Sequence, residues 1–177
     1  MKILGAIIAG GRATRFDGDK GAALLDGKAL IDHVVDGLSA HCTALMICGR
    51  EWPGLASITD RPAPDMGPLG GLNAALYVAQ QNGFDAVLSA GCDVLPVPTF
   101  GADQAGPCVV AGHYLFGLWP SSLSTKLDQH LTTQNDYSMR RWIGVSGATE
   151  IACDTPFHNL NTRADVDHYA RARGNRA

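Results

Sequence analysis

A chain of 177 residues with a net charge of −3 and 46% hydrophobic residues has the size and composition of one globular domain. The weak negative charge argues against a general nucleic-acid-binding surface, and no apolar run approaches the ~20 residues that cross a membrane. We therefore expect one domain over residues 1–177, with no nucleic acid and no membrane as partner. The five cysteines are scattered and odd in number, which argues against a disulfide framework or a zinc site and favours the reducing cytoplasm.

Apolar runs that fit strands alternate along the chain with amphipathic stretches that fit helices. Strands are predicted at residues 2–9, 44–48, 57–59, 86–90, 108–111, 115–119 and 150–153. Helices are predicted at residues 30–41, 71–81, 122–132, 136–143 and 162–173, the last with a capping box formed by Thr162 and Asp165. This alternation is typical of βαβ units. We therefore expect an α/β fold with a mostly parallel sheet, in which ligands bind beyond the carboxyl ends of the strands.

The most informative pattern follows the first predicted strand. That strand leads into Gly10 and Gly11, and the next loop contains Arg12, Arg15 and Lys20. Glycines let a ligand approach the backbone and cations neutralise phosphates, so the loop predicts a triphosphate site. It has neither the GxxxxGK[ST] spacing of ATPase phosphate loops nor the third glycine of GxGxxG. The alternative is an ordinary strand-to-helix turn.

A lone carboxylate, Asp93, follows the buried strand predicted at residues 86–90. This is a usual place to hold Mg²⁺, which takes oxygen ligands and substrate phosphates, although a helix-cap or turn aspartate is the alternative. With the cationic loop at the same sheet edge, we expect Asp93 to bind the metal. Lys20 is expected to bind the β- and γ-phosphates and Arg15 the leaving diphosphate, unless these cations are solvated loop side chains.

Two later segments offer further contacts. The glycine-rich residues 67–71 precede a predicted helix and either admit a ligand to backbone N–H groups or form a plain helix-entry turn. The amides of Asn159 and Asn161 suit a heterocycle or a phosphate, although Asn161 could instead help begin the last helix. No GxSxG or HExxH pattern occurs, and no nucleophile indicates a covalent intermediate. The implied reaction is a direct displacement, in which an acceptor phosphate attacks the α-phosphate of a nucleotide bound with Mg²⁺.

Together, these stretches resemble the molybdenum cofactor guanylyltransferases (molybdopterin-guanine dinucleotide synthases) of the nucleotidyltransferase superfamily. The matching stretches are IAGGRATRFDGDKG (residues 8–21), LDGKALIDHV (25–34), DMGPLGGL (65–72), and the set CD (92–93), FGLW (116–119) and FHNLNT (157–162). They span nearly the whole chain in order. The resemblance implies a single Rossmann-like, glycosyltransferase-A-like nucleotidyltransferase domain with three layers.

The resemblance also implies transfer of GMP from GTP to molybdopterin, with Mg²⁺ as cofactor and diphosphate as second product. The resemblance and the two glycine-rich stretches together give the expected nucleotide-binding residues, which are Ile8, Ala9, Gly10, Gly11, Lys20, Cys48, Asp60, Gly67 and Asp93. Asp93 would hold the metal, and Asn159 and Asn161 would face the molybdopterin acceptor. Molybdopterin insertase and molybdoenzyme chaperones are the implied protein partners.

The chain departs from the family pattern in two notable places. Cys48 stands where the family usually has asparagine, and residues 98–112 are too few for the usual strand–helix–strand. The first loop and the GPLGG stretch at residues 67–71 favour GTP over CTP. Two alternatives stay open: a related nucleotidyltransferase that uses CTP or another phosphate acceptor, and an inactive nucleotide-binding relative.

Overall fold

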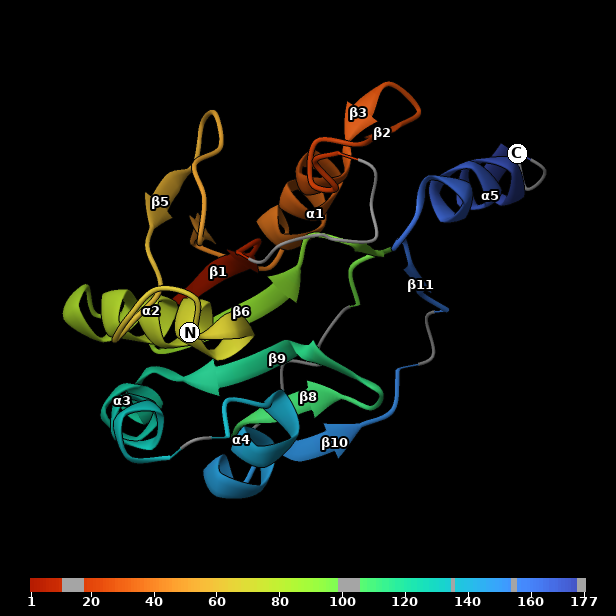
Figure 1. Cartoon of the computed structure of the whole chain (residues 1–177). Helices are drawn as coiled ribbons and strands as arrows, with labels where there is room; N and C mark the ends of the chain where they lie inside the picture. Colours follow the sequence, from red (N-terminus) through yellow and green to blue (C-terminus); the bar gives the residue numbers. More distant parts are fainter. Residues whose placement is uncertain (11–17, 99–105, 135, 154–155, 175–177) are drawn as a thin grey trace.

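A computed structural model describes residues 1–10, 18–98, 106–134, 136–153 and 156–174 (Figure 1). The strands are β1 Ile3–Ile8, β2 Leu24–Leu25, β3 Lys28–Ala29, β4 Ala44–Cys48, β5 Ala56–Ile58, β6 Ala86–Gly91, β7 Val94–Leu95, β8 Cys108–Val110, β9 His113–Pro120, β10 Thr149–Ile151 and β11 His158–Asn159. The helices are α1 Leu30–Ser39, α2 Gly67–Gln81, α3 Ser124–Thr133, α4 Met139–Ser146 and α5 Arg163–Gly174, with a 3-10 turn, η1, at Ser121–Leu123.

Seven strands form the central sheet in the order β10-β8-β9-β6-β1-β4-β5. The β1 strand is parallel to β4 and β6, β4 is parallel to β5, and β8 is parallel to β10. Only β9 runs against its neighbours in this sheet, since it is antiparallel to both β6 and β8. The predicted α/β fold with a mostly parallel sheet is therefore confirmed.

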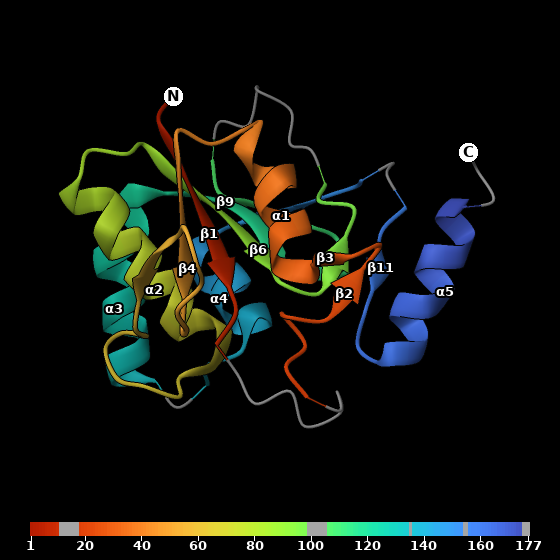
Figure 2. The same cartoon turned by 90° about the horizontal axis from the view of Figure 1, so that it is seen from above.

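Helices cover both faces of the sheet, so the strands read as nearly continuous apolar runs. Alternate residues of β1 point to opposite faces: Ile7 packs in a cluster with α1 and α5, whereas Leu4 and Ile8 pack in a cluster with α2, α3 and α4. Figure 2 shows α1 and α2 on opposite sides of β1. The result is a three-layer arrangement with one core on each side of the sheet.

Two helices begin three or more residues away from the predicted start, for reasons that are local. The α2 helix begins at Gly67 rather than at residue 71, and Pro68 lies in its first turn, where a missing backbone N–H has no cost. The α4 helix begins at Met139 rather than at residue 136, because Ser138 caps it by accepting from the Arg141 N–H at 3.2 Å.

The capping box of the last helix is confirmed. The Asp165 N–H donates to Thr162 Oγ1 at 3.2 Å, and the Thr162 N–H donates to Asp165 Oδ2 at 2.7 Å. This reciprocal pair fixes the entry of α5.

Several predictions fall outside the described residues. They are those on Gly11, Arg12 and Arg15, and the part of the shortened segment at residues 99–105. Within the described ranges, no helix is both long and apolar enough to cross a membrane.

Candidate active site

A cavity of about 570 Å³ opens at the carboxyl edge of the sheet, where the parallel strands β1, β4 and β6 end together. Its described lining residues are Ile8, Ala9, Gly10, Gly18, Asp19, Lys20, Gly21, Arg50, Cys92, Asp93 and Leu115. The volume lies within the roughly 300–1,000 Å³ that small-molecule sites occupy. Five of the expected site residues line this one cavity: Ile8, Ala9, Gly10, Lys20 and Asp93.

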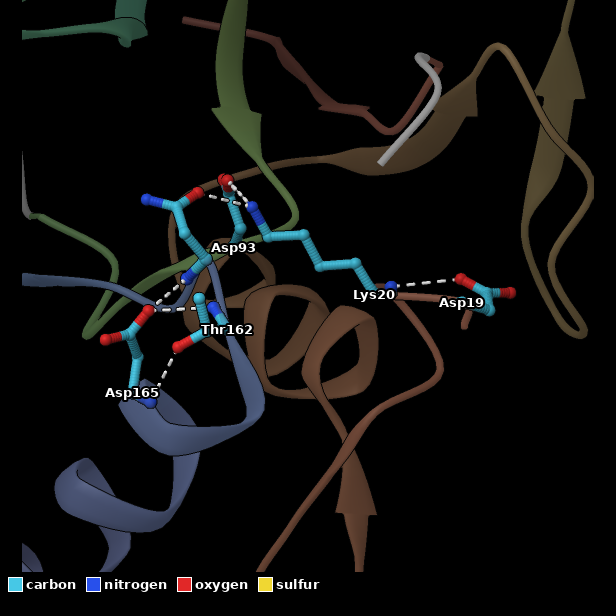
Figure 3. Close-up of polar contacts among 7 residues, drawn as sticks. Asp19, Lys20, Asp93, Thr162 and Asp165 are labelled. Carbon is cyan, nitrogen blue, oxygen red and sulfur yellow. Dashed lines mark hydrogen bonds and ion pairs between the residues drawn. The ribbon is translucent and has the colours of Figure 1, made fainter. Parts of the chain in front are cut away.

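The ammonium of Lys20 is held by two oxygen acceptors from distant parts of the chain (Figure 3). Its Nζ donates to Asp93 Oδ2, just after β6, and to Asn161 Oδ1 at 2.7 Å, just before α5. The side chains of Lys20 and Asp93 are only 15% and 23% exposed. Partial burial strengthens this ion pair relative to one on the open surface.

The segment that supplies Asn161 is fixed beside Asp93 by backbone contacts. The β11 strand pairs with β7, and the Leu160 N–H donates to the Asp93 carbonyl at 2.7 Å. The Asn161 N–H also donates to Asp165 Oδ2 at 3.0 Å, so the capping box of α5 sets the position of this asparagine. Local helix chemistry therefore places an amide oxygen in the site.

Asp19 and Arg50 form a second ion pair at the same cavity. Arg50 Nη1 and Nη2 donate to the two Asp19 carboxylate oxygens at 2.7 Å and 2.6 Å. The hydrogen bonds from Arg50 hold the pKa of Asp19 below its usual value. We call Asp19, Lys20, Arg50, Asp93 and Asn161 the charged cluster.

The oxygen ligands that the charged cluster offers fit Mg²⁺. Mg²⁺ keeps several waters and is usually bound by one or two carboxylates together with substrate phosphates. Asp93 offers such a carboxylate at the cavity wall, next to a lysine that suits phosphates. Within the part of the chain that the structure describes, no group of three or more acidic, histidine or cysteine ligands exists. A shared site with a phosphate ligand therefore fits better than an all-protein cage.

A group of glycines surrounds the carboxylate of Asp60 beside the cavity. A Cβ added at Gly10 or Gly49 would lie 3.6 or 3.5 Å from Asp60 Oδ1. A Cβ added at Gly70 would lie 3.0 Å from Asp60 Cβ. Burial, with a smaller contribution from the nearby Asp65 charge, raises the pKa of Asp60. We call Gly10, Gly49, Asp60 and Gly70 the glycine cluster.

Besides Asp60 and Asn161, three further expected residues are not among the described lining residues of the cavity. The side chain of Cys48 is completely buried beneath α2, where burial and the Asp60 charge raise the pKa of its thiol to about 12. Its carbonyl accepts from the Ala9 N–H at 3.1 Å, so its backbone supports the strand end. Gly67 opens α2, and Asn159 is an exposed residue of β11.

Sequence reasoning overlooked Asp19, Arg50 and Cys92 as individual site residues. Arg50 lies two residues after the strand predicted at residues 44–48, so inspection of that strand end would have found it. Burial and the Asp93 charge raise the pKa of Cys92 to about 11, so this thiol stays protonated and is a poor nucleophile. This agrees with a site that works without a covalent intermediate.

Comparison with known proteins identifies the family. Residues 5–150 match the model of the MobA-like NTP transferase domain. The molybdenum cofactor guanylyltransferase of Yersinia pseudotuberculosis serotype O:1b (strain IP 31758) is 31% identical, over 97% of this chain and 96% of the relative.

Solved structures share the fold. Molybdopterin-guanine dinucleotide biosynthesis protein A from Archaeoglobus fulgidus has a TM-score of 0.71 at 17% identity, over 97% of this chain and 99% of that one. A manganese complex of a Mycobacterium tuberculosis H37Rv protein has a TM-score of 0.60 at 12% identity, over 97% and 100% of the two chains. From the family match and the relative together, the chain belongs to the MobA-like NTP transferase family of nucleotidyltransferases.

Proposed function

We propose that this nucleotidyltransferase transfers GMP from GTP to molybdopterin in the cytoplasm, forming molybdopterin-guanine dinucleotide and releasing diphosphate, with Mg²⁺ as cofactor. The observation that carries the proposal is the contact of Lys20 with Asp93 and Asn161 at a cavity of suitable size. The name of the Yersinia relative supports guanylyl transfer and this acceptor.

The nucleoside is assigned to the end of β1 and the glycine cluster. Ile8, Ala9, Gly10 and Gly11 offer backbone groups to the base and ribose, and glycine allows the closest approach. The carboxylate of Asp60 is a hydrogen-bond acceptor for nucleotide N–H or O–H groups. Cys48 and Gly67 contribute through the backbone, because the Cys48 side chain is buried and Gly67 has none.

The triphosphate is assigned to the charged cluster. Lys20 and Asp93 satisfy each other's charge in the structure. With GTP and the metal bound, Lys20 would bind the β- and γ-phosphates and Asp93 would hold the metal. Mg²⁺ held there supplies charge neutralisation for the phosphates.

The reaction is a single displacement at the α-phosphorus. An oxygen of the acceptor phosphate forms the new bond to the α-phosphorus, and the bond from that phosphorus to the bridging oxygen breaks. The electron pair leaves with diphosphate, whose charge Lys20 and Arg15 stabilise. The protein mainly positions the two substrates, with the acceptor assigned to Asn159 and Asn161.

The test measures diphosphate release by the whole protein with molybdopterin and Mg²⁺, with GTP and CTP offered in parallel reactions. We expect release with GTP, little release with CTP, and none after the metal is removed by a chelator. Release with CTP alone would overturn the choice of nucleotide. GTP binding without any diphosphate release would instead favour another acceptor or an inactive nucleotide-binding protein.

A further inference from the structure

Arg50 lines the cavity, yet none of the roles assigned above uses it. It follows Gly49 directly after β4 and shares the cavity wall with the turn at residues 18–21. A guanidinium beside an expected triphosphate would ordinarily be assigned to the phosphates themselves. The contacts of Arg50 point to a different role.

The charge of Arg50 is already satisfied by Asp19. Both terminal nitrogens of the guanidinium donate to the two carboxylate oxygens, at 2.7 Å and 2.6 Å. This two-point geometry matches a planar guanidinium and cannot be reproduced by a lysine ammonium. The side chain of Arg50 is 28% exposed and that of Asp19 is 45% exposed, so Arg50 is the better buried partner of the pair.

Asp19 in turn fixes the backbone that follows Lys20. Its Oδ1 accepts from the Gly21 N–H at 3.0 Å and from the Ala22 N–H at 3.3 Å. The Asp19 carboxylate therefore closes a tight turn around Lys20, because Asp19 precedes Lys20 and its carboxylate binds the backbone of the two residues that follow Lys20. Figure 3 shows Asp19 on one side of Lys20, while the extended Lys20 side chain reaches Asp93 on the other side.

Arg50 is itself anchored to the body of the fold. Its Cζ lies 5.2 Å from the centroid of the Trp52 ring, and Trp52 Nε1 donates to Asp32 Oδ1 at 2.7 Å. Asp32 lies in the first turn of α1. A continuous series of contacts thus runs from α1 through Trp52 and Arg50 to the turn that presents Lys20.

From this series we propose that Arg50 is a positioning residue, which acts through Asp19 to hold the Lys20 ammonium where the triphosphate binds. The role of Lys20 rests on the proposed function, whereas the ordering of the turn by Arg50 does not. The guanidinium keeps N–H groups beyond the two that bind Asp19, including a buried Nε with no hydrogen-bond partner among the described residues, so direct contact with phosphate is the alternative that the test excludes.

Binding of GTP with Mg²⁺ tests this proposal by calorimetry on R50Q, R50K, D19N and the R50Q/D19N double variant. We expect about a tenfold loss of affinity in each single variant, because one charged hydrogen-bonded pair is broken in each. The double variant should lose no more than either single variant, since both changes break the same contact. R50K should not rescue binding, because lysine lacks the two-point geometry.

A second measurement needs no nucleotide. Hydrogen exchange of the Gly21 and Ala22 amides should be faster in R50Q and R50K than in the wild type, since the carboxylate that accepts from them is no longer held. R173Q is the matched control, because it removes the arginine from an exposed pair with Asp26 (3.4 Å) elsewhere on the surface. It should change neither GTP affinity nor these amides.

The outcomes separate the two proposals. Tighter GTP binding in D19N, or normal binding in R50K, would mean that Arg50 contacts the phosphates directly and would overturn the positioning role. Unchanged exchange of Gly21 and Ala22 in R50Q would overturn it as well. A wild-type protein that binds no nucleoside triphosphate would overturn the proposed function, while amide exchange would still decide whether Arg50 orders the turn.

Discussion

Gly10 of the glycine cluster lines the same cavity as the four charged residues of the charged cluster, yet the two clusters hold their carboxylates in opposite ways. In the charged cluster, Asp93 and Asp19 are each paired with a cation. In the glycine cluster, the Asp60 carboxylate has no hydrogen bond or ion pair to any described residue, and burial raises its pKa. Three glycines lie close to it, and the charge that acts on its pKa, that of Asp65, has the same sign.

This difference indicates two ways of preparing a site for a ligand. The charged cluster is balanced internally, so a ligand must exchange partners with existing ion pairs. The glycine cluster is shaped by backbone proximity and keeps one acceptor without a partner, so a ligand can add hydrogen bonds there without breaking any. A partly buried carboxylate without a partner costs some stability, and such costs are concentrated at functional sites.

The largest effect is expected from Asp93→Asn. The neutral amide is a poor Mg²⁺ ligand, so turnover should fall by about 100-fold or more, measured as diphosphate release at saturating GTP. Asp36→Asn is the matched control, because Asp36 also pairs with a lysine, Lys28, but lies on the exposed face of α1. Intact turnover of the Asp93 variant at ordinary Mg²⁺ would show that the metal assignment is wrong.

A smaller effect, on stability, is expected from Gly49→Ala in the glycine cluster. Gly49 has φ +84°, and an added Cβ would lie 2.8 Å from the backbone nitrogen of Gly10. We expect a loss of about 1–3 kcal/mol from the backbone strain alone, and more from the clash, in the free energy of unfolding measured with urea.

Gly54→Ala separates these two contributions. Gly54 has φ +79° but nothing within 4 Å of an added Cβ, so only the strain should appear. If both variants lose the same free energy of unfolding, the close approach of Gly49 and Gly10 is not a constraint on the fold.

The smallest effect is expected from Asp60→Asn, which should raise the Tm at neutral pH by about 2 °C. The folded-state pKa of Asp60 is raised, so folding favours the protonated form, and stability is lost as pH rises through that pKa. The amide is always neutral, so the gain should shrink as pH falls and the wild-type carboxylate becomes protonated.

Asp165→Asn is the control of opposite sign. The Thr162 hydrogen bonds lower the pKa of Asp165, so its ionised form stabilises the fold, and stability is lost as pH falls through that lowered pKa. This variant should have a lower Tm at neutral pH, with a deficit that shrinks on acidification. A constant Tm difference across pH 4–8 for Asp60→Asn would contradict the assigned ionisation.

The sequence alone predicts features that follow a periodic pattern of apolar residues or that depend on local chemistry. The apolar period of residues 30–38 predicts α1, and the spacing of Thr162 and Asp165 predicts the start of α5. The position of Asp93 after a buried strand likewise predicts a site residue, and Asp93 lines the cavity. Each of these predictions needs only a short window of residues.

Features that depend on distant pairing could not be predicted in this way. The two-residue strands β7 and β11 are too short for a periodic pattern, and they form only because residues 94–95 meet residues 158–159. The antiparallel direction of β9 and the contact of Arg50 with Asp19 likewise arise from the tertiary arrangement. No single stretch of sequence contains that information.

The hydrogen bond between Lys20 and Asn161 also has a consequence for biosynthesis. Its two partners are 141 positions apart in the chain, so at roughly 5–20 residues per second the ribosome adds the second about 7–28 s after the first. Throughout that interval the nascent chain contains the glycine loop and Lys20 but lacks the amide oxygen that completes the cluster. Co-translational folding can therefore build β1, β4 and β6 early, whereas the finished cavity wall must wait for nearly the whole chain.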